Sequence, residues 1–505
     1  MKTYICRNCG HIENTDNLEK DFVCPKCGKL SNQFDMIENQ IGEDEIDAII
    51  DSVIEDANDI DNATIVNNID EERSIKISNN NSVIEKIQDK CINCGLCRKT
   101  CEKIVNIKYD LSICKEPICI GCGQCILSCP SSSIISKTDY KEIKEIIDLN
   151  EKIVIGILSP GVTASLNEIL KIDEEKYNEK KVISSLKKLG FDFVFDESFG
   201  NDLLIVEETA ELIERIKNKK NLPLFTSSCP SWVKYCEIYH PELLNNLSSC
   251  KSPIDMQCTC IKNYFCSKKG FDPAKIVCVL ITPCTGRKME IKEYNSSLDY
   301  AITVPELGLL IKEENIKVES LEEREFDRIV GIGSGCGSEF SISGGQSESI
   351  IRTLYRIMSK KNISKKADVF DGLKESKGIK EATIIINRSK INVAVIEQME
   401  NLETILKDNY YKNYHLIEVM NCNSGCIGGG GQPITNIDDI TKCKENRKKY
   451  ISRIDKIKEF GCAHENDEIK DLYKEFFEKP LSEKAISSLH RQFKDKSEML
   501  RNLQM

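Results

Sequence analysis

The sequence predicts a multidomain α/β protein with several metal-binding cysteine groups. Its 505 residues are too many for one hydrophobic core, so several domains are expected. Apolar stretches at 152–159, 275–282 and 391–398 alternate with helical patterns, which is typical of α/β folds. Twenty-six cysteines are present, and many of them recur at short, regular spacings. We therefore expect small cysteine-rich domains followed by a large α/β domain.

Composition excludes several classes of function. The net charge of −11 argues against a nucleic-acid partner, because phosphate binding needs a basic surface. No apolar run reaches the roughly 20 residues of a membrane-spanning helix, and the first residues lack the apolar core of a secretory signal. We therefore expect a cytoplasmic protein that contacts no membrane. Thiols stay reduced in that compartment, so spaced cysteines indicate metal ligands.

The first cysteine group lies in residues 1–34 and consists of two CxxC pairs. Such pairs, each followed by glycine, predict a four-sulfur tetrahedral site. The ligands are Cys6, Cys9, Cys24 and Cys27. The spacing does not distinguish iron from zinc. The surrounding YICRNCGHI and FVCPKCGKLSNQFD resemble a rubredoxin-like module, which favours one redox-active iron, and a structural zinc is the alternative.

Residues 35–85 predict an acidic linker. Isoleucines and one valine recur partly at helical spacing around 41–56, which indicates an amphipathic acidic helix. Such a helix packs on its own protein or docks a partner, and the pattern leaves both open. The polar stretch that follows predicts an irregular connection.

The second group is an internal repeat within residues 86–140. Each half is the cysteine run of a ferredoxin that holds [4Fe–4S] clusters, in which the fourth cysteine ligates the other cluster. One set is therefore Cys91, Cys94, Cys97 and Cys129; the other is Cys119, Cys122, Cys125 and Cys101. Two such clusters predict an electron path to a further acceptor or donor.

The third group is dispersed over 200 residues of the chain, in TSSCPSW, ITPCTGRKME and EVMNCNSGCIGGGGQP. Its cysteines are Cys229, Cys284, Cys422 and Cys426, enough for one more cubane cluster. The glycine run 428–431 allows the backbone to pass close to a bulky inorganic group, because glycine has no Cβ.

With these motifs, the sequence resembles an [FeFe]-hydrogenase over about residues 86–490. The segments IVEETAELIER, GSGCGSEFSISGGQSESIIR and FGCAHENDEIKDLYKEFFEKPLSEKAISSLH continue the similarity. The resemblance implies a two-lobed α/β domain over 150–505 that holds an H-cluster, a cubane joined to a diiron unit with CO, cyanide and a dithiolate. It implies that the four dispersed cysteines bind the cubane, that Cys426 bridges to the diiron unit and that Met420 packs beside it. The implied reaction is the reversible formation of H2 from two protons and two electrons.

Several positions depart from the family pattern. Ser228 stands where catalytic members have a proton-transferring cysteine, although the remaining relay positions Glu208, Glu211 and Ser248 match. Proton transfer through a serine alkoxide would add at most roughly 7 kcal/mol to the barrier, which would slow the reaction by a factor of about 10⁵. Two other departures are Thr282 for a methionine and Arg287 for a lysine that donates to a cyanide. The resemblance also places Ile254 where a polar residue lies near the ligands of the distal iron, and Gly161 where a serine or alanine lies near the other cyanide. This combination resembles the divergent, sensory-type branches of the family.

The resemblance leaves three hypotheses about the function of the protein. The first is a slow hydrogenase that exchanges electrons with a ferredoxin or rubredoxin-type carrier. The second is a sensor of H2 or redox state that signals to a separate protein. The third is a non-catalytic iron–sulfur carrier or scaffold, which the retained Cys426 and glycine run disfavour. A diiron unit would require hydrogenase maturation proteins.

Overall fold

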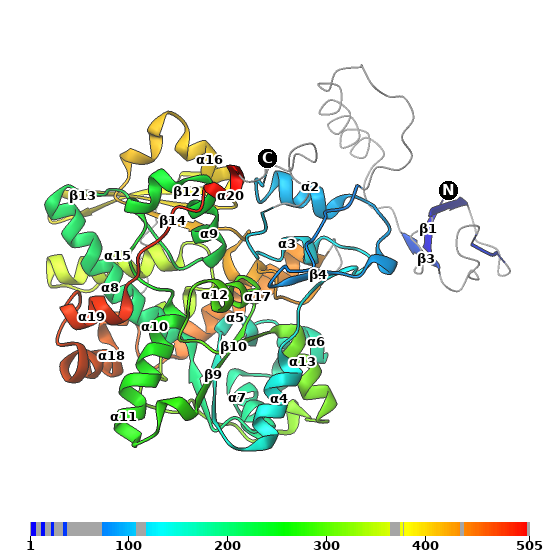
Figure 1. Cartoon of the computed structure of the whole chain (residues 1–505), viewed down its shortest axis with the longest axis horizontal. Coiled ribbons are helices and arrows are strands. Elements are labelled where there is room, and N and C mark those ends of the chain that lie inside the picture. The colour runs from blue at the N-terminus through cyan, green and yellow to red at the C-terminus, as the bar shows by residue number, and fades with distance from the viewer. Residues whose placement is uncertain are drawn as a thin grey trace. The chain divides into compact units, whose positions relative to one another are not determined.

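The computed structural model describes most of the chain and divides it into two compact units, Met1–Glu71 and Glu72–Met505 (Figure 1). The described residues are 2–6, 12–15, 22–24, 34–37, 73–107, 118–363, 374–376, 378–434 and 439–501. Each unit is considered by itself. In the described residues, no helix combines the length and the apolar character needed to cross a lipid bilayer.

The first unit contains a three-stranded antiparallel sheet in the order β2-β1-β3. Its strands are β1 (Lys2–Cys6), β2 (Ile12–Thr15) and β3 (Phe34–Ile37), and Cys6 pairs with Phe34. The first domain was expected to end at residue 34, but β3 carries the sheet through Ile37. Cys24 is buried, whereas Cys9, Cys27 and the predicted acidic helix lie outside the described residues.

The second unit begins with the cysteine-rich module, which comprises residues 73–107 and 118–137. Strand β4 (Ile84–Lys86) pairs antiparallel with β5 (Ile134–Ser136), and the helices are α2 (Leu96–Lys103) and α3 (Gln124–Leu127). Ile75 and Val83 pack in one cluster with Cys97 and Cys125. This module therefore starts near residue 73 rather than 86, because apolar residues expected in the linker cover its cysteines.

A four-stranded parallel sheet in the order β10-β9-β6-β7 forms one lobe of the large domain. Its strands are β6 (Ile153–Leu158), β7 (Phe193–Asp196), β9 (Ile276–Thr282) and β10 (Tyr300–Thr303). Nearly every residue of β6 and β9 is buried, as expected for a parallel sheet that is covered on both faces. The helices of this lobe include α4 (Tyr140–Leu149), α5 (Pro160–Thr163), α6 (Leu166–Leu170), α7 (Glu179–Leu189), α12 (Gly286–Glu293) and α13 (Val304–Glu313).

A five-stranded mixed sheet in the order β11-β12-β13-β14-β8 forms the other lobe. Its strands are β8 (Leu224–Phe225), β11 (Lys374–Ser376), β12 (Ile379–Ile386), β13 (Ser389–Glu397) and β14 (Leu416–Met420). The pairs β13–β14 and β14–β8 are parallel. Its helices include α9 (Pro230–Tyr239), α15 (Gly345–Ser359) and α16 (Met399–Leu406). The α/β class is confirmed, and the three predicted strand segments are β6, β9 and β13.

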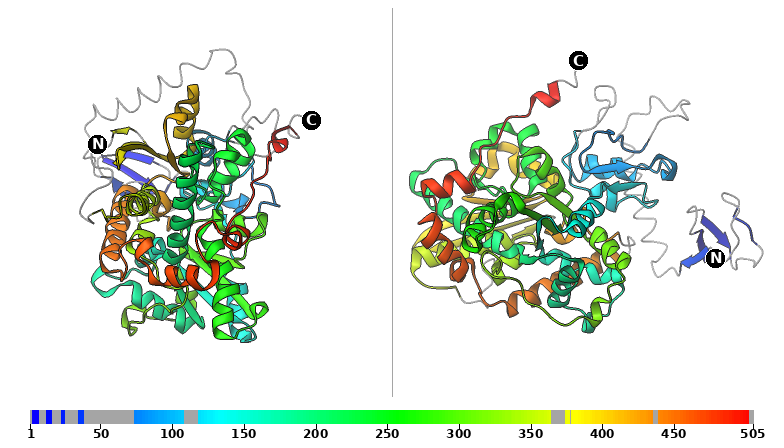
Figure 2. Two further views of the ribbon diagram at one scale, coloured as in Figure 1. Left: turned by 90° about the vertical axis from the view of Figure 1, so that its left-hand side faces the viewer. Right: turned by 60° about the horizontal axis from the view of Figure 1, so that its bottom comes forward.

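Helix α8 (Glu197–Asn218) joins the cores of the two lobes. Asp196 caps its first turn by accepting a hydrogen bond from the Ser198 amide. Side chains of α8 share one apolar cluster with Ile155 of β6 and Val393 of β13. The other α-helices of the described residues are α10 (Pro253–Cys260), α11 (Cys266–Lys269), α14 (Gly335–Glu339), α17 (Ile440–Ile457), α18 (Asp467–Leu472), α19 (Glu483–Leu489) and α20 (Glu498–Arg501). Figure 2 shows the helices arranged around the strands of both lobes.

Candidate functional site

The four dispersed cysteines line one cavity at the carboxyl ends of strands from both lobes. Cys229 follows β8, Cys284 follows β9, and Cys422 with Cys426 follows β14. Ligand sites in open α/β sheets commonly lie outside the carboxyl ends of strands. The fold thus brings together sulfurs that are up to 197 positions apart, from 229 to 426.

Cys229 is the N-cap residue of α9, and Pro230 is the first residue of that helix. Proline suits this position because its fixed backbone angle fits a first turn, where no amide donor is required. The buried Trp232 donates from Nε1 to the Thr226 carbonyl, 2.9 Å away. The tryptophan therefore anchors the turn that presents Cys229 at a helix N-terminus, where negative charge is stabilised.

The glycine run lies between the cavity and the cysteine-rich module. A Cβ on Gly429 would lie 2.3 Å from the Pro283 carbonyl oxygen, and one on Gly430 would lie 2.4 Å from the Cys122 carbonyl oxygen. Neither position has room for a side chain. The run is therefore required by close backbone packing around Cys426 and Cys122.

Burial makes three thiols of this cavity, those of Cys284, Cys422 and Cys426, hard to ionise. It raises the pKa of Cys284 to about 11 and raises the pKa values of Cys422 and Cys426 well above the ordinary value, with neighbouring sulfurs adding to the effect in all three. Four thiolates in so small a space would repel one another strongly. A multivalent cation or metal cluster removes that repulsion and displaces the protons.

Four further predicted residues, Ser228, Thr282, Arg287 and Met420, also line the cavity. Arg287 donates to the Ser228 carbonyl at 2.9 Å and to Glu290 at 2.6 Å, so its charge is held in the wall. Ile254 and Gly161, which were expected near the cluster, do not line it. Ile254 packs in the apolar core, and Gly161 packs against Pro283.

Sequence reasoning missed several polar residues of the cavity wall, among them Glu197, Asn201 and Asn421. Glu197 and Asn201 are one turn apart on α8, and Asn421 stands between Met420 and Cys422. The side-chain oxygen and nitrogen of Asn421 are both buried, and this side chain lies close enough to Cys122 to influence its thiol. No spacing signal marks these positions, because only the tertiary fold places them beside the cysteines.

The predicted relay residues lie in one buried series on the α8 side of the cavity. Glu208 and Glu211 are both on α8, and the Ser248 hydroxyl donates to Glu211 Oε2 at 3.0 Å and also interacts with Glu208. Burial raises the pKa of Glu208 to about 8. Ser228 does not reach Glu208 directly. It donates to Gln346, a residue that sequence reasoning did not identify.

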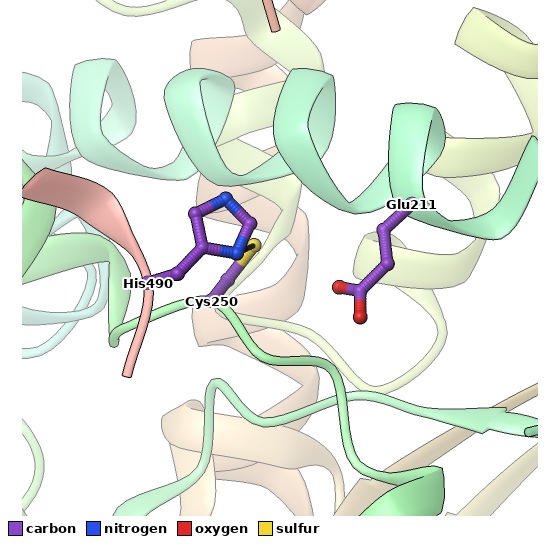
Figure 3. A group of neighbouring side chains, drawn as sticks. All are labelled: Glu211, Cys250 and His490. Carbon is purple, nitrogen blue, oxygen red and sulfur yellow. Dashed lines mark hydrogen bonds between the residues drawn. The ribbon is translucent and has the colours of Figure 1, made fainter. Parts of the chain in front are cut away.

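The outer end of this series approaches a surface hollow. Glu211 and Arg215 line that hollow, and the Arg215 guanidinium donates to Glu211 Oε1 at 2.7 Å. Figure 3 shows Glu211 near Cys250 and His490, whose possible ligand atoms all lie within 4.8 Å of one another. His490 Nδ1 lies 2.8 Å from Ser249 Oγ, so this nitrogen already has a polar partner.

The predicted ferredoxin cysteines also gather. One cavity in the module is lined by Cys101, Cys119, Cys122 and Cys125 together with apolar residues, and this is one complete expected set. Charges at Cys94 and Cys129 influence Cys97, so these three members of the other set are neighbours. Cys91 precedes them at the end of a short turn.

The module contacts the main cavity through its second set. Gln124 Nε2 lies 3.2 Å from Cys422 Sγ and 3.0 Å from the Gly428 carbonyl. The Thr285 hydroxyl donates to the Gly121 carbonyl at 2.8 Å. Cys122 lines both cavities. The sulfurs of the second set are therefore close neighbours of the sulfurs in the main cavity.

Comparison with known proteins identifies the family. Residues 152–430 match the family described as iron only hydrogenase large subunit, C-terminal domain, and residues 441–496 match iron hydrogenase small subunit. Iron hydrogenase 1 of Clostridium pasteurianum is 37% identical over 379 residues, 72% of this chain and 65% of that protein. The NADP-reducing hydrogenase subunit HndD of Solidesulfovibrio fructosivorans is 32% identical over 434 residues, 80% of this chain and 73% of that protein.

A solved structure shares the fold. The [FeFe]-hydrogenase HydA1 from Chlamydomonas reinhardtii superimposes with a TM-score of 0.63 at 29% identity, and the match covers 71% of this chain and 99% of that chain. The chain spans less than two thirds of the Clostridium relative, and about three quarters of the Solidesulfovibrio one.

Proposed function

Because the chain belongs to the iron-only hydrogenase family, we propose that it activates H2 reversibly at an H-cluster held in the cavity between the two lobes. The observation that carries this proposal is the convergence of Cys229, Cys284, Cys422 and Cys426 on one buried cavity within the matched region. Four sulfur donors suit a cubane cluster. We assign Cys426 as the bridge to the diiron unit.

The residues present fit this group. The cavity supplies four thiols, the backbone around Gly429 leaves no room for other side chains, and Arg287 places a positive charge in the wall. When bound, an H-cluster supplies the two-electron chemistry that interconverts H2 with protons and electrons. Thr282 and Met420 occupy the cavity wall beside Cys284 and Cys422, where they shape the space and exclude water.

Electrons reach the cavity through the cysteine-rich module in this proposal. One [4Fe–4S] cluster is held by Cys91, Cys94, Cys97 and Cys129, and the second is held by Cys101, Cys119, Cys122 and Cys125. The second set lies next to the main cavity, since Cys122 lines both. A ferredoxin or rubredoxin-type carrier is the expected external partner.

The N-terminal unit adds one metal in this proposal. Cys6, Cys9, Cys24 and Cys27 hold iron, or zinc if the site is only structural. Zinc analysis of the full chain distinguishes the two, because the iron–sulfur clusters of the second unit contain iron and absorb visible light whichever metal this site holds. A Cys24→Ser variant should lose that one metal while the clusters of the second unit persist.

Proton supply limits the rate in this proposal. Ser228 occupies the position next to Cys229, and its hydroxyl is a far weaker acid than a thiol. Glu208, Ser248 and Glu211 continue toward the surface hollow. Slow turnover at an intact site also suits a sensor of H2 that signals to a separate protein, which is the second candidate function.

The test is H2 exchange by matured protein. Incubation with deuterium gas in ordinary water should release HD, slowly in the unaltered chain and not at all in a Cys426→Ser variant that still holds its ferredoxin clusters. Equal HD release by both would contradict the proposed site. For the sensor, a deletion of residues 38–71 should abolish binding of a purified partner, and unchanged binding would remove that segment from the account.

A further inference from the structure

Gln346 lies between the cavity and the first carboxylate of the relay. The Ser228 hydroxyl donates to Gln346 Oε1 at 2.6 Å, and Gln346 Nε2 donates to Glu208 Oε2 at 2.5 Å. The exposed fractions are 2% for Ser228 and 0% for the other two. One amide therefore spans the whole gap between the hydroxyl and the carboxylate.

The position of Gln346 is fixed by its own backbone. It is the second residue of α15, and Glu418 accepts hydrogen bonds from the amides of Gly344 and Ser347 at 2.8 and 2.7 Å. Glu418 is itself fully buried on β14. The turn that carries Gln346 is thus held on both sides, and the side chain has little freedom to leave the gap.

An amide is a poor proton carrier. To pass one proton, Oε1 would have to accept the Ser228 proton while Nε2 released one to Glu208, and the side chain would be left as an imidic acid. The group would then have to return its N–H and C=O to their original places before the next proton. Primary amides donate and accept hydrogen bonds but neither gain nor lose protons near neutral pH.

We propose that Gln346 is a positioning residue that blocks proton transfer between Ser228 and Glu208, so that protons pass only slowly between the cavity and the carboxylates of the relay. This inference rests on the proposed function and deepens it. Ser228 and Gln346 are two obstacles in series, and relieving one leaves the other in place. The buried site can therefore exchange electrons with the cysteine-rich module while its protons exchange slowly with solvent.

The rate test is a double-mutant cycle in matured protein, read as HD release. Ser228→Cys and Gln346→Glu should each raise the rate less than about tenfold, and the double variant should raise it at least about 100-fold, more than the product of the singles. Adding Glu208→Gln to the double variant should remove the gain. A Gln346→Met variant, matched in length but without an amide, should leave the rate low with either residue at 228.

A second readout needs no diiron unit. In unmatured protein, the protonated Glu208 carboxyl should give an infrared band that is identified by its loss in Glu208→Gln. Removing the Gln346 donor disfavours the charged carboxylate, so Gln346→Met should move the titration midpoint of this band upward by about one pH unit. Iron content and the cubane signal report whether each variant is folded.

The outcomes separate the two hypotheses. If Ser228→Cys alone gives the full gain, or if Glu208 titrates identically with glutamine and methionine at 346, the proposed role of Gln346 is wrong. If matured protein lacks bands from iron-bound CO and cyanide, the proposed function fails. In that case the titration still decides whether Gln346 holds Glu208.

Discussion

The Gln124 side-chain amide lies 3.2 Å from the sulfur of Cys422, although the two residues are 298 positions apart. Gln124 belongs to the cysteine-rich module, and Cys422 belongs to the main cavity. Hydrogen bonds to cluster sulfurs are one of the means by which a protein sets a reduction potential. This contact therefore links the module to the electronic properties of the proposed cubane.

Replacement of Gln124 by Met should lower the reduction potential of the main cubane. An N–H donor stabilises the reduced cluster, which carries more negative charge, so its loss favours the oxidised form. The shift should be about 20–60 mV, from the energy of one hydrogen bond and a one-electron couple. A redox titration monitored by electron paramagnetic resonance measures it. The exposed Gln88→Met in the same module serves as the control, and an equal shift in both would refute the assignment.

Cys101→Ser should cost the chain one ferredoxin cluster. Cys101 lines the cavity of the second set although it lies in the first cysteine run, so the crossed ligation predicts loss of the cluster next to the main cavity. The matched control is Cys236→Ser, since Cys236 is buried but only donates to the His240 carbonyl. The iron and sulfide content per chain should fall in Cys101→Ser and should stay unchanged in Cys236→Ser. The reverse result would overturn the ligand sets.

Gly430→Ala should separate the module from the main cavity. The added Cβ would lie 2.4 Å from the Cys122 carbonyl oxygen, so one backbone must move, at a cost of about 1–3 kcal/mol. The Gln124 contact should be lost too, and the potential should shift as in Gln124→Met. Gly270→Ala is the control: its Cβ meets nothing within 4 Å, although its φ of +70° carries some strain. An unchanged potential in Gly430→Ala would contradict this packing argument.

Because the pKa of Glu208 is raised in the folded chain, the free energy of unfolding should fall as pH rises. Burial raises its pKa from 4.5 to about 8, so between these values the folded chain binds a proton that the unfolded chain has released. The groups that face it are Gln346, Glu211, Ser248 and the Ser227 amide. The slope is at most about 1.4 kcal/mol per pH unit. Denaturation midpoints of unmatured protein at several pH values should decline more steeply than those of Glu208→Gln, and parallel curves would exclude a raised pKa.

The sequence allowed much of the fold and the cysteine sets to be predicted. Parallel strands that are buried on both faces appear as continuous apolar runs, and β6, β9 and β13 were predicted from them. The four dispersed cysteines carry strong local signals, because glycine and proline accompany them. Their shared role as ligands of one cluster was inferred from the resemblance to the family, because their spacing alone does not predict it.

The polar wall of the site could not be predicted in the same way. Gln346 lies in a small-residue segment, and nothing local shows that it faces Ser228 across 118 positions. Ile254 illustrates the converse, because similarity to the family placed it near the cluster while its apolar side chain packs in the core. The start of the cysteine-rich module was also misplaced, since Ile75 and Val83 sit among polar residues that suggest a linker.

The most direct test of the central claim is an infrared spectrum of anaerobically purified, matured protein, first under argon and then under H2. Iron-bound CO and cyanide absorb where protein is nearly transparent. The account predicts such bands, a shift of these bands under H2, and their absence in Cys426→Ser. A matured preparation that shows no bands would mean that Cys229, Cys284, Cys422 and Cys426 hold at most a plain cubane, and that the chain is an electron carrier or scaffold.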